Sequence, residues 1–399
     1  MQTPVKIVLK PGKDASIRRF HPWVFSGAIK SKPEPLDDGA VVEVFSCSHE
    51  YLGTGIYQDA TIAVRLMAFS PERPLVLDEA FWTKKLQKAY HLRKTAGLAE
   101  NRHTNVYRLV HGEGDHLPGI IIDHYDGHLV IQVHAAGNHA FIGAIARGLE
   151  NIYGSRLKSI TDKSRETLPQ SFWEGRTFQN QLWGQPALAE VQEYGHRFLV
   201  DIEKGQKTGF FIDQRENRKL LADYAPEKKV LNTFCYTGGF SVYALQAGAA
   251  EVHSLDSSSK ALEMTSNNIA LNFGSEPRHR GINSDTLQYL KHHKEPYDLI
   301  ILDPPAFAKH THVRHNALQG YKRLNVEALK CLNPGGLLFT FSCSQVVDRL
   351  LFRGAVLAAA IEAGRTARIL HQLNQPADHP VNIYHPEGEY LKGLVLLVE

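Results

Sequence analysis

The chain has 399 residues, of which 43% are hydrophobic and 22% charged, and its formal net charge is +3. A chain of this length usually folds into two or three domains. Its composition is that of a globular protein and not of a low-complexity protein or a disulfide scaffold. No apolar run approaches the roughly 20 residues of a membrane span, and the N-terminus lacks the apolar core of a secretion signal, so we expect a cytoplasmic protein with reduced thiols and no membrane partner.

The N-terminal segment combines excess positive charge with a β-rich pattern. Residues 1–32 contain seven Lys and Arg against one acidic residue, Asp14. A basic end on a nearly neutral chain fits a polyanionic partner, with a merely solvated basic face as the alternative. Strand-like runs separated by turns predict a small barrel, and they lie at 41–45, 51–57 and 62–66. Trp23 and Phe25 either stack on a bound base or belong to the core of this barrel.

A linker and a second segment follow. The Pro-rich stretch 70–74 predicts the linker. A helical pattern over 78–93 has Asp78 as its N-cap and Gly97 as its stop. Two strands and a second helix are predicted at 119–123, 128–133 and 141–152. We interpret this segment as a small α+β module without a catalytic motif of its own.

The pattern then changes to a repeat of strand, turn and helix. Strands are predicted at 229–234 and 251–256, and helices at 240–248 and 258–271. This alternation predicts a parallel, doubly wound α/β sheet. The turn Thr237-Gly238-Gly239 lies between the first strand and its helix, where backbone N–H groups bind phosphates or carboxylates.

Two acidic residues lie where a nucleotide-like cofactor would contact this sheet. Asp256 ends the second strand, where an acid accepts hydrogen bonds from ribose hydroxyls. Asp285 follows the predicted third strand, and it either binds an adenine amino group or caps a helix. The turn lacks the full Gly-x-Gly-x-x-Gly pattern, which argues against a dinucleotide. Upstream, the Gly-, Lys- and Arg-rich stretch 205–215 either contributes to this site or forms a hairpin that leads into a helix near Asp213.

Two short motifs near the C-terminus carry the chemistry. Asp303-Pro304-Pro305 follows the apolar run 297–301, and Ser342-Cys343-Ser344 follows the run 336–340. Because the carboxyl ends of parallel strands meet at one edge of a sheet, an acid, two prolines and a thiol should line one cleft. A carboxylate beside a nucleophilic thiol suits covalent attack on an electron-poor ring.

Together these motifs resemble bacterial 23S rRNA (cytosine-5)-methyltransferases of the large-subunit methyltransferase I type. Each motif alone is weak, but the combination is specific and covers nearly the whole chain. The matching stretches lie at 21–25, 107–115, 207–210, 213–215, 234–240, 303–305, 341–344, 377–380 and 386–393. Two local departures are Ala306, where the family commonly has Lys, and 161–164, where Arg-Ser-Asp-like residues are usual. Both bear on target choice rather than on the reaction.

The resemblance implies an α/β fold in three parts: a PUA-like RNA-binding barrel in 1–72, a central α+β domain in 73–188, and a Rossmann-like class I methyltransferase domain in 189–399. It implies S-adenosylmethionine as the cofactor. The partner that it implies is 23S rRNA, as large-subunit RNA or an assembly intermediate, bound by a monomer or homodimer. The residues that it places around the cofactor are Lys207, Phe210, Gln214, Phe234, Tyr236, Thr237, Gly238, Gly239, Asp256, Asp285, Asp303 and Pro304.

The resemblance also implies catalytic roles for Cys343 and Asp303. Cys343 would attack carbon 6 of cytosine, which makes carbon 5 nucleophilic enough to take a methyl group, and Asp303 would hydrogen-bond the N3/N4 edge of the base. Cys343 could instead be a small buried hydrophobic residue, the structural role that we expect for Cys235 and Cys331. No histidine spacing predicts a metal site. Two other functions stay open: methylation of a guanine ring nitrogen such as N7 in rRNA, which needs no thiol, and a non-catalytic RNA-binding assembly factor.

Overall fold

The computed structural model describes residues 5–69, 75–293, 295–308 and 310–399. By internal contacts the chain divides into two compact units. The first consists of Met1–Val191, Val200–Phe210 and Ala377–Gly388, and the second of Gln192–Leu199, Phe211–Pro376 and Glu389–Glu399, apart from the residues just excluded. The predicted linker at 70–74 lies outside the described residues, and the predicted division into three domains stays a prediction.

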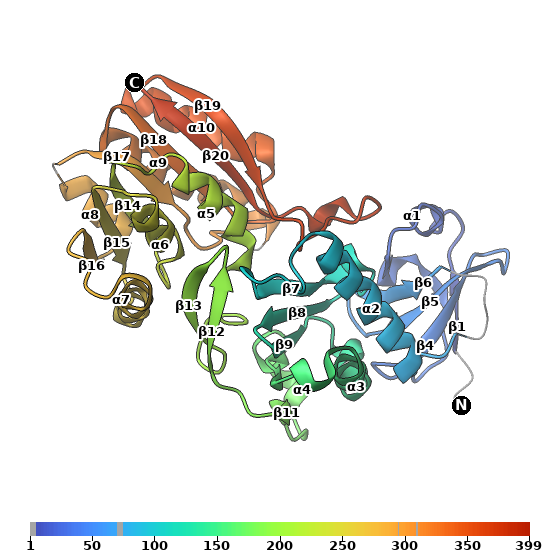
Figure 1. The fold of residues 1–399 in the computed structure, drawn as a ribbon. Helices are drawn as coiled ribbons and strands as arrows, with labels where there is room; N and C mark the ends of the chain where they lie inside the picture. The colour runs from blue at the N-terminus through green and yellow to red at the C-terminus, as the bar shows by residue number, and fades with distance from the viewer. Residues whose placement is uncertain (1–4, 70–74, 294, 309) are drawn as a thin grey trace. The chain divides into compact units, whose positions relative to one another are not determined.

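The N-terminal part of the first unit is a curled six-stranded sheet in the order β2-β6-β5-β4-β1-β3, with the short helix α1 (Ala15–Arg18) beside it (Figure 1). The strands are β1 (Val5–Leu9), β2 (Trp23–Phe25), β3 (Ile29–Ser31), β4 (Val41–Phe45), β5 (Tyr51–Tyr57) and β6 (Ile62–Ala68). Apolar side chains from these strands, such as Ile7, Val42 and Val64, form one buried core. A Cβ at Gly55 would lie 2.3 Å from the Arg65 carbonyl oxygen, so β5 can approach β6 only because residue 55 is glycine. The three predicted barrel strands are confirmed.

A second sheet in the first unit has the order β11-β10-β9-β8-β7. Its strands are β7 (Val106–His111), β8 (Ile120–Tyr125), β9 (His128–Val133), β10 (Ser159–Asp162) and β11 (Gln181–Gly184). The helices α2 (Glu79–Thr95) and α3 (Ile142–Tyr153) pack on it through a shared core that includes Trp82 and Leu149. Asp78 Oδ1 accepts the Phe81 N–H at 2.9 Å, which confirms the predicted N-cap of α2. The short helix α4 (Gln170–Trp173) precedes β11, and β12 (Leu188–Glu193) and β13 (His196–Asp201) form a separate hairpin.

The second unit is built on a seven-stranded sheet in the order β16-β15-β14-β17-β18-β20-β19. The strands are β14 (Lys229–Thr233), β15 (Glu251–Asp256), β16 (His279–Asn283), β17 (Tyr297–Leu302), β18 (Leu332–Ser342), β19 (Ala367–Asn374) and β20 (Lys392–Val398). The first five in this order are parallel, whereas β20 runs antiparallel to both of its neighbours. The predicted parallel α/β sheet is confirmed.

Helices cover both faces of this sheet (Figure 1). They are α5 (Arg215–Ala222), α6 (Gly239–Gln246), α7 (Ser259–Phe273), α8 (Thr286–His292), α9 (Arg314–Lys330) and α10 (Arg349–Ala363). Helix α6 packs against α5 and α7, and α9 packs against α8 and α10. The chain moves outward from β14 to β16 and then returns to place β17 on the other side of β14, so the strand order reverses between β14 and β17. In open α/β sheets, ligands bind at the carboxyl edge beside such a reversal.

Among the described residues, every helix is too short or too polar to span a lipid bilayer.

Candidate active site

The turn between β14 and α6 has a rare backbone conformation. Phe234 and Tyr236 have φ values of 52° and 48°, and Gly238, the N-cap of α6, has a φ of 77°. Residues other than glycine seldom adopt this left-handed region, and such residues cluster at functional sites. A Cβ at Gly238 would lie 2.6 Å from Thr265 Cγ2, so only glycine fits without a shift. The turn thus sets the first N–H groups of α6 at the carboxyl edge of the sheet.

Helix α7 holds this turn from behind. Thr265 Oγ1 donates to the Tyr236 carbonyl at 2.9 Å, and Asn268 Nδ2 donates to the Thr237 carbonyl at 2.9 Å. Both side chains are buried. The sequence pattern did not single out either residue, although two polar side chains on the inward face of a helix are the kind of signal that indicates such support.

Two acidic residues lie at the same edge. Asp256 ends β15; its Oδ2 accepts the Tyr236 N–H at 3.1 Å and its Oδ1 accepts the Ser258 N–H at 2.9 Å. Each carboxylate oxygen keeps a further lone pair, so Asp256 can still accept a ribose hydroxyl. Asp285 is the N-cap of α8, where its Oδ1 accepts the Gln288 N–H at 2.9 Å. The helix-cap alternative is therefore confirmed for Asp285, and its contact with adenine stays a prediction.

The predicted cofactor residues upstream of β14 fall in both units. Gln214 belongs to the second unit, where it ends the single helical turn η6 (Ile212–Gln214) and its Oε1 accepts Asn217 Nδ2 at 2.6 Å. Turns rather than a hairpin occupy 202–210, and the helix predicted near Asp213 is confirmed. Lys207 and Phe210 belong to the first unit, so their place beside the cofactor stays a prediction.

The loops that carry Asp303 and Cys343 follow neighbouring parallel strands. In the pairing of β17 with β18, Leu302 lies opposite Thr340, so both loops begin past the carboxyl ends of their strands. Ser344 joins the two loops, because its Oγ accepts the Ala308 N–H at 3.4 Å and lies 2.9 Å from the Tyr321 hydroxyl. The structure thus brings the acid-bearing and thiol-bearing loops together, as predicted. The roles of Asp303, Pro304 and Cys343 stay predictions.

Burial distinguishes the four cysteines. Cys235 and Cys331 are buried, and burial raises the pKa of their thiols to about 12 and to about 11. Neither therefore forms a thiolate near neutral pH. Cys47 is exposed but belongs to the first unit, whereas Cys343 is partly exposed at the carboxyl edge of the large sheet. Within the second unit, Cys343 is the cysteine whose surroundings suit a reactive thiol.

Several stretches that matched the family meet inside the first unit. Arg108 forms a two-pronged ion pair with Asp123, at 2.8 Å and 2.9 Å. Thr208 donates to the same carboxylate at 2.6 Å, and Asp378 accepts the Arg108 N–H at 2.9 Å. A fully buried Arg93 pairs with Asp115 through two contacts of 2.6 Å. These stretches therefore hold the unit together.

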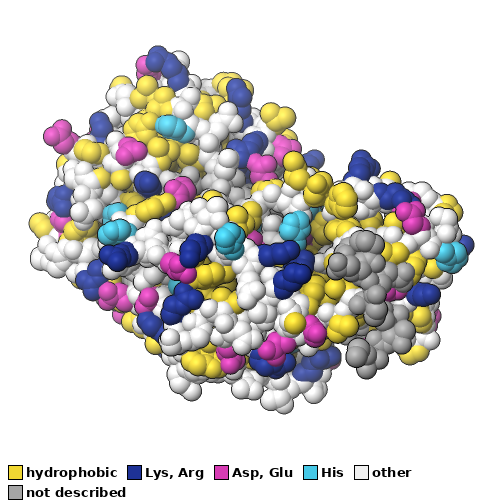
Figure 2. All heavy atoms as spheres, turned by 45° about the vertical axis from the view of Figure 1, so that its right-hand side comes forward, with side chains coloured by type: hydrophobic (Ala, Val, Ile, Leu, Met, Phe, Trp, Pro, Cys, Tyr) yellow, Lys and Arg dark blue, Asp and Glu magenta, His cyan; other side chains and the backbone are white. Residues whose placement is uncertain are grey.

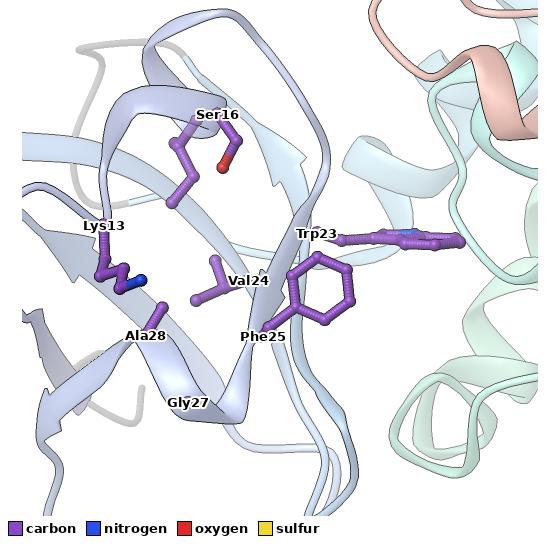
Figure 3. Close-up of a pocket in the computed structure, with 8 residues that line it drawn as sticks. Lys13, Ser16, Trp23, Val24, Phe25, Gly27 and Ala28 are labelled. Carbon is purple, nitrogen blue, oxygen red and sulfur yellow. The ribbon is translucent and has the colours of Figure 1, made fainter.

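A cavity of about 340 Å³ lies in the N-terminal barrel, beside α1 and β2 (Figure 3). Its lining residues are Lys13, Ser16, Ile17, Trp23, Val24, Phe25, Gly27 and Ala28. The two aromatic residues differ: Trp23 Nε1 donates to Glu113 at 2.8 Å and the ring is half-buried, whereas Phe25 is 46% exposed. Phe25 is therefore the one available for stacking, and neither residue belongs to the buried core of the barrel.

Part of the N-terminal positive charge is neutralised locally. Arg18 pairs with Asp14 at 2.6 Å and with Glu50 at 2.5 Å, and Lys32 lies 3.5 Å from Glu34. On the face shown in Figure 2, Lys and Arg side chains lie among Asp and Glu side chains and form no continuous basic area. Arg18 and Lys32 therefore add less to the positive field at this end of the chain than the count of charges along the sequence implies.

One group of potential metal ligands lies in the first unit, which the sequence spacing did not indicate. His21, His385 and Glu387 place one ligand atom each within 4.8 Å of the others. However, His21 Nδ1 accepts the Trp23 N–H at 3.2 Å, which puts the imidazole proton on Nε2, the atom 3.6 Å from Glu387. This tautomer suits a contact with the carboxylate better than coordination of a metal.

The sequence matches two family descriptions. An S-adenosylmethionine-dependent methyltransferase family matches residues 107–383, and a PUA-like domain family matches residues 7–69. Among curated proteins, Ribosomal RNA large subunit methyltransferase I of Escherichia coli (strain SMS-3-5 / SECEC) is 37% identical over 99% of both chains. The protein of the same name from Alteromonas mediterranea is 37% identical over 98% of both chains.

Solved structures share the fold. A structure described as a candidate S-adenosylmethionine-dependent methyltransferase from Streptococcus mutans has a TM-score of 0.83 at 23% identity, over 98% of this chain and 100% of the other. A second structure, of a candidate methyltransferase complexed with S-adenosylhomocysteine, has a TM-score of 0.83 at 24% identity over the same shares. At this level of identity the likeness shows the fold alone.

Proposed function

The chain belongs to the family of ribosomal RNA large subunit methyltransferase I, with a PUA-like domain and an S-adenosylmethionine-dependent methyltransferase domain. We propose that it methylates carbon 5 of a cytosine in large-subunit rRNA. The observation that carries the proposal is the position of Cys343. It is a partly exposed thiol past the end of β18, beside the loop that carries Asp303. Methylation of a guanine nitrogen would give no purpose to a thiol there.

The cofactor supplies a methyl group on a positively charged sulfur. The residues around the β14–α6 turn fit a nucleoside with an amino-acid tail, because the turn sets helix N–H groups and the Asp256 carboxylate at one edge. Phe234, Tyr236, Thr237, Gly238 and Gly239 would line the cofactor there. Asp285, Gln214, Lys207 and Phe210 would complete its contacts, and Asp303 and Pro304 would lie toward the base.

Carbon 5 of cytosine is too weak a nucleophile to take a methyl group unaided. The Cys343 thiolate adds to carbon 6, which breaks the aromaticity of the ring and makes carbon 5 enamine-like. Asp303 hydrogen-bonds the N3/N4 edge of the base and stabilises the charge that develops during the addition. After methyl transfer the carbon 5 proton leaves to a base, and the thiolate departs from carbon 6.

The target base must leave its stack to reach this edge of the sheet. The PUA-like barrel would hold RNA outside the target base, and its cavity, with the exposed Phe25 ring and Lys13, offers a stacking surface beside a cation. Because some N-terminal cations already pair with acids, we expect RNA binding to depend on salt less steeply than the sequence count suggests.

Nucleoside analysis of unmodified bacterial 23S rRNA, methylated with labelled S-adenosylmethionine, tests the proposal. We expect label in 5-methylcytidine with the wild-type protein and with Cys331→Ser as the matched control, and none with Cys343→Ala. Label in 7-methylguanosine, or undiminished label with Cys343→Ala, would remove the nucleophilic role from Cys343. No label with any protein would support the non-catalytic alternative.

A further inference from the structure

Lys392 is a buried cation beside the Cys343 loop. It begins β20, the residue is 4% exposed, and it pairs with Ser342, the last residue of β18, in the antiparallel register. Cys343 follows Ser342 directly. The register therefore sets Lys392 against the point where the thiol-bearing loop leaves the sheet.

The ammonium group is held by carbonyl groups. Lys392 Nζ donates to the Ser344 carbonyl at 2.7 Å and to the Tyr390 carbonyl at 2.8 Å. An ammonium has three N–H donors, so these two bonds fix its position and leave a third donor. Within the described part of the chain, no carboxylate forms an ion pair with Lys392. A lysine in this state is unusual, because buried cations are normally paired with an anion.

The charged and titratable groups around Lys392 come from three elements. Arg349, at the start of α10, pairs with Glu389 at 2.5 Å. Asp348 accepts the Leu351 N–H at 2.8 Å as the N-cap of α10. Tyr321 on α9 faces the Cys343 loop, and burial raises its pKa, so its phenol is neutral near pH 7.

The remaining titratable group is Cys343. Burial lowers the pKa of Lys392 to about 8, while negative charge at Cys343, Glu389 and Asp348 raises it, Cys343 most of the three. At pH 7 the lysine is therefore mostly a cation. When the Cys343 thiol loses its proton, the Lys392 ammonium gains a favourable electrostatic interaction with the thiolate.

We propose that Lys392 is a positioning residue that stabilises the Cys343 thiolate before it attacks the base. This inference rests on the proposed function, since it concerns the same thiol. The Cys343 S–H bond breaks, its proton leaves to solvent, and the electron pair stays on sulfur beside the ammonium. Lys392 keeps its own proton throughout, and the same thiolate is restored when sulfur leaves carbon 6. A neighbouring cation is a known physical cause of a lowered thiol pKa.

The test is the pH dependence of Cys343 alkylation in the full-length protein. Iodoacetamide is the probe, a Cys47→Ser background removes the exposed thiol of the first unit, and peptide mass spectrometry reads Cys343 directly. We expect a midpoint below the ordinary thiol value of about 8.5. Lys392→Gln should raise the midpoint by about one pH unit, which lowers alkylation and methylation at pH 7 about tenfold and lets both recover as the pH rises. Lys392→Arg, which keeps the charge, should keep the midpoint. Lys322→Gln, which removes a different cation of the second unit, is the control and should also leave the midpoint unchanged.

Two results would overturn the inference. One is a wild-type midpoint at or above 8.5, which needs no variant to fold. The other is an equal midpoint in wild type and Lys392→Gln, which would make Lys392 a structural link between two carbonyls. The variant Cys343→Ala distinguishes failure of this inference from failure of the proposed function. Full methylation by Cys343→Ala would contradict the covalent mechanism itself. If Cys343→Ala loses methylation but the alkylation midpoint is unchanged in Lys392→Gln, only the role of Lys392 is contradicted.

Discussion

Glu193 and Arg218 form a buried, two-pronged ion pair next to the glycine turn: Arg218 Nε lies 2.7 Å from Glu193 Oε1, and Nη2 lies 2.8 Å from Oε2. Arg218 also donates to the Phe211 carbonyl at 3.0 Å, and Tyr243 on α6 donates to Glu193 at 3.1 Å. A Cβ at Gly239 would lie 3.0 Å from Arg218 Cδ. The pair therefore links β12, α5 and α6 behind the turn that would hold the cofactor.

Loss of this pair should destabilise the second unit. Glu193→Gln leaves a buried guanidinium without its counter-charge, and we expect the free energy of unfolding to fall by about 3–5 kcal/mol. Urea unfolding followed by circular dichroism measures it. The matched control is Lys322→Gln, which breaks the solvent-exposed 2.5 Å pair with Glu362 in the same unit and should lower the free energy of unfolding far less, because water and salt screen a pair of this kind. Equal losses in the two variants would contradict the structural role of Glu193.

The glycine turn should tolerate no side chain at position 238. Gly238→Ala is unfavourable for two reasons: the backbone φ of 77° is strained for alanine, and the new Cβ would clash with Thr265 Cγ2 at 2.6 Å. Gly248→Ala is the control, because its φ of 91° gives the same kind of backbone strain but its Cβ would meet open space. We expect Gly238→Ala to lose about 1–3 kcal/mol more than Gly248→Ala. Calorimetric titration with S-adenosylhomocysteine should show weaker binding only for Gly238→Ala, and similar binding by both would contradict the assignment of the turn.

Native cysteines should differ in reactivity by burial. At pH 8, iodoacetamide should modify Cys47 and Cys343 in the folded protein and leave Cys235 and Cys331 intact, because burial raises the pKa of these two thiols to about 12 and to about 11. All four should react in urea. Modification of Cys235 as fast as Cys343 in the folded protein would show that burial does not separate them.

His124 should make the first unit sensitive to acid. The ring is stacked against Tyr107 at 4.4 Å, its Nε2 accepts the Gly127 N–H at 3.0 Å, and burial lowers its pKa to about 3. As the pH falls below about 6.5, His124 binds a proton in the unfolded chain but not yet in the folded protein. The free energy of unfolding therefore decreases between about pH 6.5 and about pH 3.

The measurement is the free energy of unfolding at pH 7 and at pH 4.5. Wild type should lose about 2–3 kcal/mol more than His124→Phe over this interval. His91→Gln removes an exposed histidine of the same unit and should lose as much as wild type. An equal loss in wild type and His124→Phe would show that another group carries the acid sensitivity.

Local sequence signals predicted most of the parallel sheet. The strand at 251–256, the glycine turn after β14 and the two C-terminal loops follow from apolar runs bounded by turn residues, and the structure has them where predicted. The α2 cap at Asp78 was equally local. Such features depend on neighbours along the chain, which the sequence displays.

Features that depend on distant parts of the chain could not be predicted in this way. The tail brings β20 between β18 and β19, which sets Lys392 against the Cys343 loop from a point almost 50 residues downstream. Likewise Tyr390 donates to Asp213 at 2.7 Å across the second unit. The positive count in residues 1–32 predicted a basic surface, but Glu50 comes back to pair with Arg18. Pairings of this kind are set by topology and not by local pattern.

The most direct test of the covalent mechanism uses rRNA transcribed with 5-fluorocytidine. Fluorine at carbon 5 cannot leave as the proton does, so the Cys343 sulfur should stay bonded to carbon 6 after methyl transfer. We predict a protein–RNA complex that survives denaturing electrophoresis, depends on S-adenosylmethionine, and maps by tandem mass spectrometry to Cys343. The complex should form with Cys331→Ser and be absent with Cys343→Ala. Methylation of normal rRNA without a trapped complex, or a complex that maps to another cysteine, would contradict the mechanism.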